Sequence, residues 1–113
     1  MSRIYKILPR ADWTAAHEAG RYEGSALDLQ DGYIHFSTAA QAQETARRHF
    51  AGQADLVVLE VEADDLGELI RWEPSRGGDL FPHLYGALAA SLVRYVMPAP
   101  LGADGTPVLG ELS

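Results

Sequence analysis

The chain has 113 residues, 47% of them hydrophobic, which is long enough to bury the core of one ordinary domain. Its 16 acidic and 9 basic residues give a net charge of -7, which argues against nucleic-acid binding, although a small nucleotide remains allowed. The absence of cysteine excludes disulfides, thiolate metal sites and thiol nucleophiles. No apolar run reaches the length of a membrane span or a secretory signal, so we expect a cytoplasmic protein without a membrane partner.

The chain opens with a strand, a helix and a loop. Alternating apolar residues predict a strand over residues 3–8. The alanine-rich stretch 9–20 predicts a short amphipathic helix, with Gly20 placed to cap its C-terminus. Residues 21–32 contain Gly-Ser and Asp-Gly pairs and are predicted to be mostly loop, with a short extended piece over residues 26–29.

A second strand leads directly into a second helix. Residues 33–37 alternate polar and apolar side chains, which predicts a strand. Thr38 and Gln41 have the spacing of a capping box, and alanines at helical intervals predict a helix that continues to Phe50.

Further strands are predicted over residues 55–62, 69–73 and 92–97. The first of these carries an apolar run typical of a central strand, with glutamates that predict a half-exposed end. Residues 81–86 are predicted as a rigid loop framed by proline and glycine. The order of elements, with two helices confined to the N-terminal half, predicts an α+β fold.

The whole chain, residues 1–113, is expected to form a single domain. Its core spans about residues 3–97, and residues 98–113 form a Pro/Gly-rich C-terminal tail expected to be loosely ordered. The sequence does not indicate an oligomeric state.

The first candidate site is the strand over residues 33–37. Alternation places Tyr33, His35 and Ser37 on one face and Ile34 and Phe36 on the other, towards the core. The helix that follows offers free backbone N–H groups to an anion. The alternative is that His35 makes only an internal hydrogen bond and that the helix cap is purely structural.

The second candidate site is the segment FPHLYG, in which His83 and Tyr85 are framed by Pro82 and Gly86. A rigid loop of this kind can present polar groups to a ligand. The alternative is a turn whose aromatic side chains fill the edge of the core.

Trp72 and Glu73 are adjacent on a predicted strand and therefore face opposite ways. We expect Trp72 to be buried and Glu73 to be solvated.

Other catalytic signatures are missing from the sequence. There is no GxGxxG, Walker loop, HExxH or G-x-S-x-G motif. A metal site would have to combine His35, His83 and distant carboxylates, so none is predicted. A Ser-His-Asp hydrolase built on Ser25 or Ser37 would lack the nucleophile elbow.

Several motifs in series resemble the bacterial domain-of-unknown-function family 952. They are IYKI, a tryptophan-bearing helix, YEGSALDLQDGYIHFSTAAQ, DLVVLEV, RWE and FPHLYG, in this order. The resemblance covers about residues 3–97. That family is grouped with the ADP-ribosyltransferase superfamily, which implies a split, mostly antiparallel α+β sheet that holds NAD in a cleft.

The resemblance also implies roles for individual residues. His35 and Ser37 in the sequence H-F-S are similar to the superfamily motif that holds a ribose hydroxyl, and closest to the branch that includes the RNA 2'-phosphotransferases. The motif of the catalytic glutamate has no clear match, and Glu73, His83 and Tyr85 are the nearest polar residues.

Two hypotheses follow. The first is an enzyme that binds NAD or a related nucleotide and transfers an ADP-ribosyl or similar group. Its expected catalytic residues are His35, Glu73 and His83, and its expected ligand contacts are Lys6, Ser25, Tyr33, Ser37 and Tyr85. The second is a non-catalytic module that binds a small ligand or a protein and has kept only the cleft.

Overall fold

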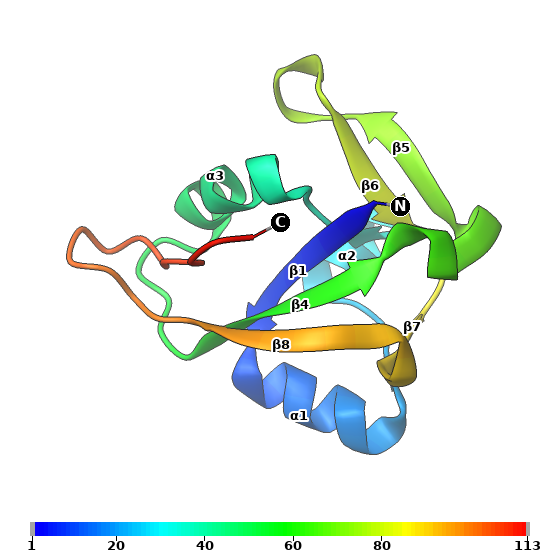
Figure 1. The fold of residues 1–113 in the computed structure, drawn as a ribbon, viewed down its shortest axis with the longest axis horizontal. Coiled ribbons are helices and arrows are strands. Elements are labelled where there is room, and N and C mark those ends of the chain that lie inside the picture. The colour runs from blue at the N-terminus through cyan, green and yellow to red at the C-terminus, as the bar shows by residue number, and fades with distance from the viewer. Residues whose placement is uncertain (1, 113) are drawn as a thin grey trace.

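Three long strands form the central sheet of the computed structural model, which describes residues 2–112. They are β1 (Arg3–Pro9), β4 (Leu56–Glu62) and β8 (Val93–Ala99), paired antiparallel in the order β1-β4-β8 (Figure 1). The predicted central position of β4 is confirmed, because it lies between the other two strands and is buried throughout. β8 lies at the sheet edge, where a strand tolerates proline, so it continues through Pro98 instead of ending before it.

The end of β4 is buried, which corrects the expectation of a half-exposed end. Glu60 and Glu62 are only 6% and 5% exposed. The Tyr5 hydroxyl donates to Glu60 at 3.1 Å, and the backbone N–H of Ser2 donates to Glu62 at 2.7 Å. Neighbouring donors therefore satisfy carboxylates that alternation alone would assign to solvent.

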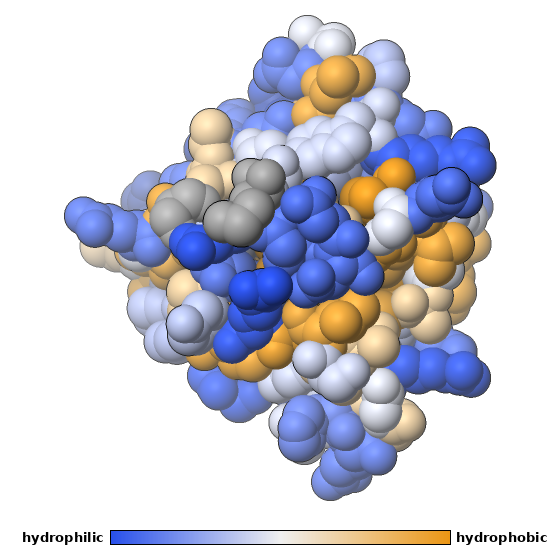
Figure 2. Space-filling view, turned by 45° about the vertical axis from the view of Figure 1, so that its right-hand side comes forward, coloured by the Kyte–Doolittle hydropathy of each residue, from blue (hydrophilic) through white to orange (hydrophobic). Residues whose placement is uncertain are grey.

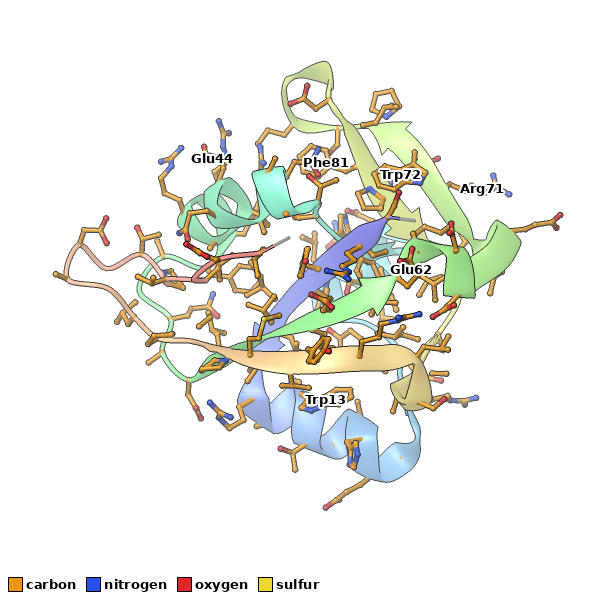
Figure 3. The ribbon with its side chains drawn as sticks, in the orientation of Figure 1. Trp13, Glu44, Glu62, Arg71, Trp72 and Phe81 are labelled. Carbon is orange, nitrogen blue, oxygen red and sulfur yellow. The ribbon has the colours of Figure 1, made fainter. Side chains whose placement is uncertain are left out.

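Two helices cover the two faces of the central sheet. On one face, Ile4 belongs to an apolar cluster against which Trp13 of α1 (Arg10–Ala19) packs (Figure 3). On the other face, Tyr5 belongs to a cluster that includes the buried alanines of α3 (Ala39–His49). Alternate side chains of β1 thus pack into different clusters, because successive side chains of a strand point to opposite faces of the sheet.

The predicted ends of these helices are confirmed. Gly20 caps α1 in the left-handed conformation, with φ 87°. Thr38 and Gln41 form the predicted capping box at the start of α3.

A third helix, α2 (Ala26–Asp31), replaces half of the loop predicted over residues 21–32, including the extended piece expected over residues 26–29. The Ser25 side chain accepts from the backbone N–H of Asp28, and the Asp28 carboxylate accepts from the backbone N–H of Ser25. Gly32 ends the helix at φ 88°. The loop prediction was wrong because Ser25 and Asp28 form a capping box that stabilises a helix of little more than one turn.

A second three-stranded sheet carries both candidate histidines. It consists of β3 (Ile34–His35), β6 (Leu80–Leu84) and β5 (Ile70–Pro74), paired antiparallel in the order β3-β6-β5. The rigid loop predicted over residues 81–86 is therefore largely a strand. Its proline does not disrupt the sheet, because the carbonyl of Pro82 still accepts from the backbone N–H of Phe36 at 3.0 Å.

The burial expected for Trp72 and Glu73 is also corrected. Trp72 is 39% exposed and stands on the outer face of the β5–β6 hairpin (Figure 3). Glu73 turns to the other face and makes hydrogen bonds to His83 and Tyr85. Alternation separates the two side chains correctly, but it does not determine which face the molecule covers.

Short elements complete the chain. β2 (Arg21–Tyr22) pairs with β7 (Leu88–Ala89), and 3-10 turns occupy Ala63–Leu69, Arg76–Gly78 and Ala90–Leu92. The α-helices all lie in the first half and the paired strands are antiparallel, which confirms the predicted α+β class. No helix within residues 2–112 combines the length and apolar character needed to cross a membrane.

The C-terminal segment packs against the core, which differs from the loose tail expected. Pro107 is fully buried, and Leu109 belongs to the same cluster as Tyr5. The Gln43 side chain donates to the carbonyl of Pro107 at 2.8 Å and accepts from the backbone N–H of Leu109 at 3.3 Å. On the face drawn in Figure 2, hydrophilic side chains surround smaller apolar patches.

Candidate functional site

His35 lies between two carboxylates. Its Nδ1 is 2.6 Å from Oδ1 of Asp28, and its Nε2 is 2.9 Å from Oδ2 of Asp31. Both carboxylates belong to α2, so the helix that the loop prediction missed supplies both partners. Both nitrogens of the imidazole therefore face carboxylate oxygens, which fixes the orientation of the ring.

The carboxylate of Asp28 holds several of the site residues in place, and its side chain is only 2% exposed. It accepts from Nζ of Lys6 at 2.8 Å, from the backbone N–H of Ser25 at 2.9 Å and from the backbone N–H of His35 at 3.1 Å. Burial would raise the pKa of Asp28, but hydrogen bonds from His35 and Lys6 and the charge of Lys6 bring it well below its usual range. Burial lowers the pKa of Lys6, and Asp28 opposes that shift.

His83 is held by Glu73 from the neighbouring strand. Its Nδ1 is 2.8 Å from Oε1 of Glu73, and the Tyr85 hydroxyl donates to the same oxygen at 2.8 Å. These hydrogen bonds, first from His83 and then from Tyr85, lower the pKa of Glu73. Glu73 is therefore an ionised acceptor that fixes the orientation of the imidazole.

An aromatic cluster joins the two histidines. His35 of β3 and His83 of β6 are directly paired across the strands, with ring centroids 5.6 Å apart. Tyr33 stacks on His83 with centroids 4.0 Å apart and an interplanar angle of 24°, and its centroid is 4.6 Å from that of His35. The predicted shared face of Tyr33 and His35 is thus present, and β6 adds the second histidine to it.

A cavity of about 310 Å³ opens beside this cluster. Its lining includes six of the predicted site residues: Lys6, Ser25, Tyr33, His35, Ser37 and His83. Glu73 and Tyr85 do not line it and instead support His83 from behind. A volume of this size falls at the lower end of the range for small-molecule sites.

The cavity also contains polar residues that the sequence analysis did not single out. They are Asp28, Asp31, Thr45, His49, Ser75 and Arg76. The capping-box spacing of Ser25 and Asp28 was a usable signal for α2 and hence for both aspartates. Nothing in the local sequence predicts that Arg76, in a hairpin turn, meets Thr45 of α3.

The side chains of residues 2–112 do not form a metal-binding site. None of their His, Asp and Glu side chains form a set of three or more that could hold an ion. The nearest approach to a cluster is His35 with its two aspartates, and there both imidazole nitrogens already face carboxylate oxygens.

A family model described as a protein of unknown function (DUF952) matches residues 7–96. The chain belongs to the DUF952 family. The predicted family membership is thereby confirmed. This DUF952 protein is similar to protein CC0527 from Caulobacter crescentus, and the two chains are 58% identical.

The X-ray crystal structure of CC0527 matches this DUF952 chain with a TM-score of 0.94, over 96% of this chain and 96% of that chain. The solution NMR structure of CC0527 matches with 58% identity and a TM-score of 0.85, over 95% of this chain and 92% of that chain. No curated protein matches the chain.

Proposed function

We propose that the cavity binds a nucleotide through its ribose, with NAD as the first candidate, and that His35 contacts a ribose hydroxyl. The observation that carries this proposal is the fixed position of the His35 imidazole, between Asp28 and Asp31 at 2.6 and 2.9 Å. A ribose hydroxyl reaches the imidazole by taking the place of the partly exposed Asp31 carboxylate at Nε2, while the buried Asp28 keeps Nδ1. The displaced carboxylate can then accept from the neighbouring hydroxyl of the ribose diol. The similarity of the H-F-S sequence to the ribose-holding motif of ADP-ribosyltransferases supports the same assignment.

The aromatic cluster provides the second element of this proposal. The side chain of His35 is 30% exposed, and the ring of Tyr33 lies next to it. Aromatic rings present flat apolar surfaces on which a base can stack. His83 is only 3% exposed beneath Tyr33, so we assign it and Glu73 positioning roles.

We further propose that the site transfers an ADP-ribosyl group from NAD. In this reaction nicotinamide leaves with the electron pair of the glycosidic bond, positive charge develops on the ribose, and an acceptor nucleophile then adds to it. A carboxylate near the ribose stabilises that charge. Asp31, with its side chain 34% exposed beside His35, is the carboxylate in this position.

The second candidate function is a non-catalytic module that binds the nucleotide without turning it over. One observation favours it: no glutamate within residues 2–112 lines the cavity, and Glu73 is occupied by His83 and Tyr85. The two candidates predict the same binding and differ in turnover.

Calorimetric titration of the wild type with NAD, ADP-ribose and a 2'-phosphorylated nucleotide tests binding. We expect His35→Ala to weaken binding by at least about tenfold, because it removes the side chain assigned to the ribose hydroxyl. His17→Ala is the matched control, because His17 lies on α1 outside the cavity. Failure of all three ligands to bind the wild type would contradict the proposal.

Nicotinamide release from NAD separates the two candidate functions. Release that is lost in Asp31→Asn would support the transferase. Binding of NAD with no release in the presence of nucleophilic acceptors would favour the module.

A further inference from the structure

The part of the cavity formed by α3 and the β5–β6 turn differs from the part around Asp31 in its elements and in its charge. It is lined by Thr45 and His49 of α3 and by Ser75 and Arg76 of the β5–β6 turn. The ribose assignment above uses none of these four residues. Their chemistry therefore bears on a second part of the ligand.

Arg76 is held in place but its charge is not neutralised. Its Nη1 donates to Oγ1 of Thr45 at 3.3 Å, and its guanidinium carbon lies 4.8 Å from the centroid of the Phe81 ring. Phe81 belongs to β6 and lies on the side of the hairpin that faces α3 (Figure 3). Within residues 2–112, no carboxylate forms an ion pair with Arg76, whereas Lys6, the other basic side chain of the cavity, is paired with Asp28.

The absence of a carboxylate partner for Arg76 among the described residues points to a ligand, because the chain is rich in acidic residues. The chain has 16 acidic residues for 9 basic ones, so an arginine in a cavity could readily have been given an acidic partner. A half-buried guanidinium without a counter-ion retains most of its N–H donors for a ligand. Its planar fork matches the oxygens of a phosphate group in a bidentate arrangement.

The hydroxyl of Thr45 fixes the orientation of the Arg76 guanidinium through its hydrogen bonds. The Thr45 hydroxyl donates to the carbonyl of Gln41 at 3.1 Å. It therefore accepts from both Arg76 and the Ser37 hydroxyl, whose Oγ is 2.9 Å away. Ser37 is 4% exposed, so this chain of contacts ties the guanidinium to a buried anchor.

His49 completes this end of the cavity. Burial, and then the charge of Arg76, lower the pKa of His49, so its imidazole favours the neutral form beside the guanidinium. A neutral imidazole can donate one hydrogen bond to an oxyanion while Arg76 supplies the charge.

We propose that Arg76, Thr45 and His49 form a subsite for the phosphate of the ligand, so that the protein selects phosphorylated ribosyl compounds over free nucleosides. This inference rests on the proposed function for the ribose, and it adds the class of ligand and the residues that select it. A cavity of about 310 Å³ lies at the lower end of the range for small-molecule sites, so we assign it one base, ribose and phosphate unit of a larger ligand such as NAD.

The test compares nicotinamide mononucleotide with nicotinamide riboside, which differ by one phosphate, using calorimetry. We expect the wild type to bind the mononucleotide at least about tenfold more tightly, as charge-assisted hydrogen bonds predict. In Arg76→Gln we expect the two affinities to come within about twofold of each other. Equal affinities in the wild type, or an unchanged preference in Arg76→Gln, would overturn the inference but leave the proposed function standing.

Arg71→Gln is the matched control. Arg71 lies on the same hairpin, with its guanidinium 5.0 Å from the centroid of the Tyr85 ring, but it does not line the cavity. We expect it to keep the preference of the wild type. If Arg71→Gln also loses the preference for the mononucleotide, the preference comes from the general charge of the hairpin. That result would overturn the proposed phosphate subsite.

A second measurement is independent of ribose binding. Titration of the wild type and Arg76→Gln with inorganic phosphate, followed by NMR at constant ionic strength, should shift the signals of Thr45 and His49 only in the wild type. If neither nicotinamide compound binds, calorimetry with NAD and ADP-ribose still decides the proposed function, and the phosphate titration alone decides the subsite. No shift at Thr45 and His49 in the wild type would overturn it.

Discussion

His35 and His83 are directly opposite each other on antiparallel strands, and each presents its Nδ1 to a carboxylate oxygen, at 2.6 Å for Asp28 and 2.8 Å for Glu73. The two carboxylates come from opposite sides, one from α2 and one from β5. Carboxylates in this position fix the tautomer and the orientation of an imidazole. The two histidines are therefore fixed in the same way by different elements, so the two halves of the site can be perturbed separately.

The buried pair of Lys6 and Asp28 gives the first prediction. In Asp28→Asn, Lys6 loses its counter-ion in a buried position, so we expect the free energy of unfolding to fall by about 3 kcal/mol. Asp31→Asn serves as the control and should cost below about 1 kcal/mol, because Asp31 is partly exposed. Urea denaturation monitored by circular dichroism measures both, and equal losses would contradict the central role of Asp28.

The second prediction concerns acid pH. The pKa of Asp28 is lowered in the folded protein, so between its folded pKa and its ordinary value of about 4 the unfolded state binds more protons. The stability contributed by Asp28 is therefore complete above about pH 5 and is lost as the pH falls.

The loss of stability between pH 5 and pH 3 should be greater in the wild type than in Asp28→Asn, by more than about 1 kcal/mol. Urea denaturation at pH 5, 4 and 3 measures this difference. Parallel pH profiles for the two proteins would show that Asp28 keeps an ordinary pKa on folding.

The third prediction compares two glycines that flank α2. Gly24 and Gly32 both have positive φ, 112° and 88°, but a Cβ at Gly24 would lie 2.9 Å from the Cβ of Asp28, whereas a Cβ at Gly32 would meet nothing within 4 Å. Gly32→Ala should cost about 1 kcal/mol through backbone strain alone. Gly24→Ala should cost about 2 kcal/mol or more and should also weaken nucleotide binding, because it displaces Asp28.

Thermal or urea unfolding of the two glycine variants, combined with calorimetry, separates strain from displacement. Equal costs, with binding retained in Gly24→Ala, would mean that the contact with Asp28 has no role in shaping the site.

The fourth prediction concerns the other half of the site. The hydrogen bond to Glu73 is the main cause of the raised pKa of Tyr85, while the charge of Arg71 acts in the opposite direction. Glu73→Gln should therefore lower the pKa of Tyr85, and Arg71→Gln should raise it further. NMR signals of the Tyr85 ring carbons, followed against pH, measure the pKa of Tyr85 in both variants. A pKa change of the same sign in the two variants would contradict the opposite effects of Glu73 and Arg71.

Local patterns predict much of the framework and only part of the site. Alternation correctly places Ile34 and Phe36 in the core, with His35 on the opposite face of their segment. Capping and glycine signals correctly give the ends of α1 and α3. These features depend on neighbours within a few residues, which a single sequence contains.

The features that local patterns do not predict depend on long-range pairing. The exposure of Trp72 depends on how the hairpin packs against the rest of the protein. Alternation separates the two faces of a strand but does not tell which of them is buried. The contact between Arg76 and Thr45 joins residues 31 positions apart across a turn and a helix. The two aspartates of α2 are hard to predict for a different reason, because Ser25 and Asp31 also belong to Gly-Ser and Asp-Gly pairs, which are typical of turns.

NMR titration of the wild type with ADP-ribose tests the central claim most directly, because it maps the bound ligand onto the chain. The account predicts shifts that saturate and concentrate in residues 31–37, at Thr45 and His49, and at Ser75 and Arg76, while the edge strand β8 stays unchanged. Absence of shifts, or shifts concentrated in the smaller hollow around Glu23, Leu29 and Gly86, would contradict the claim that this cavity binds a nucleotide.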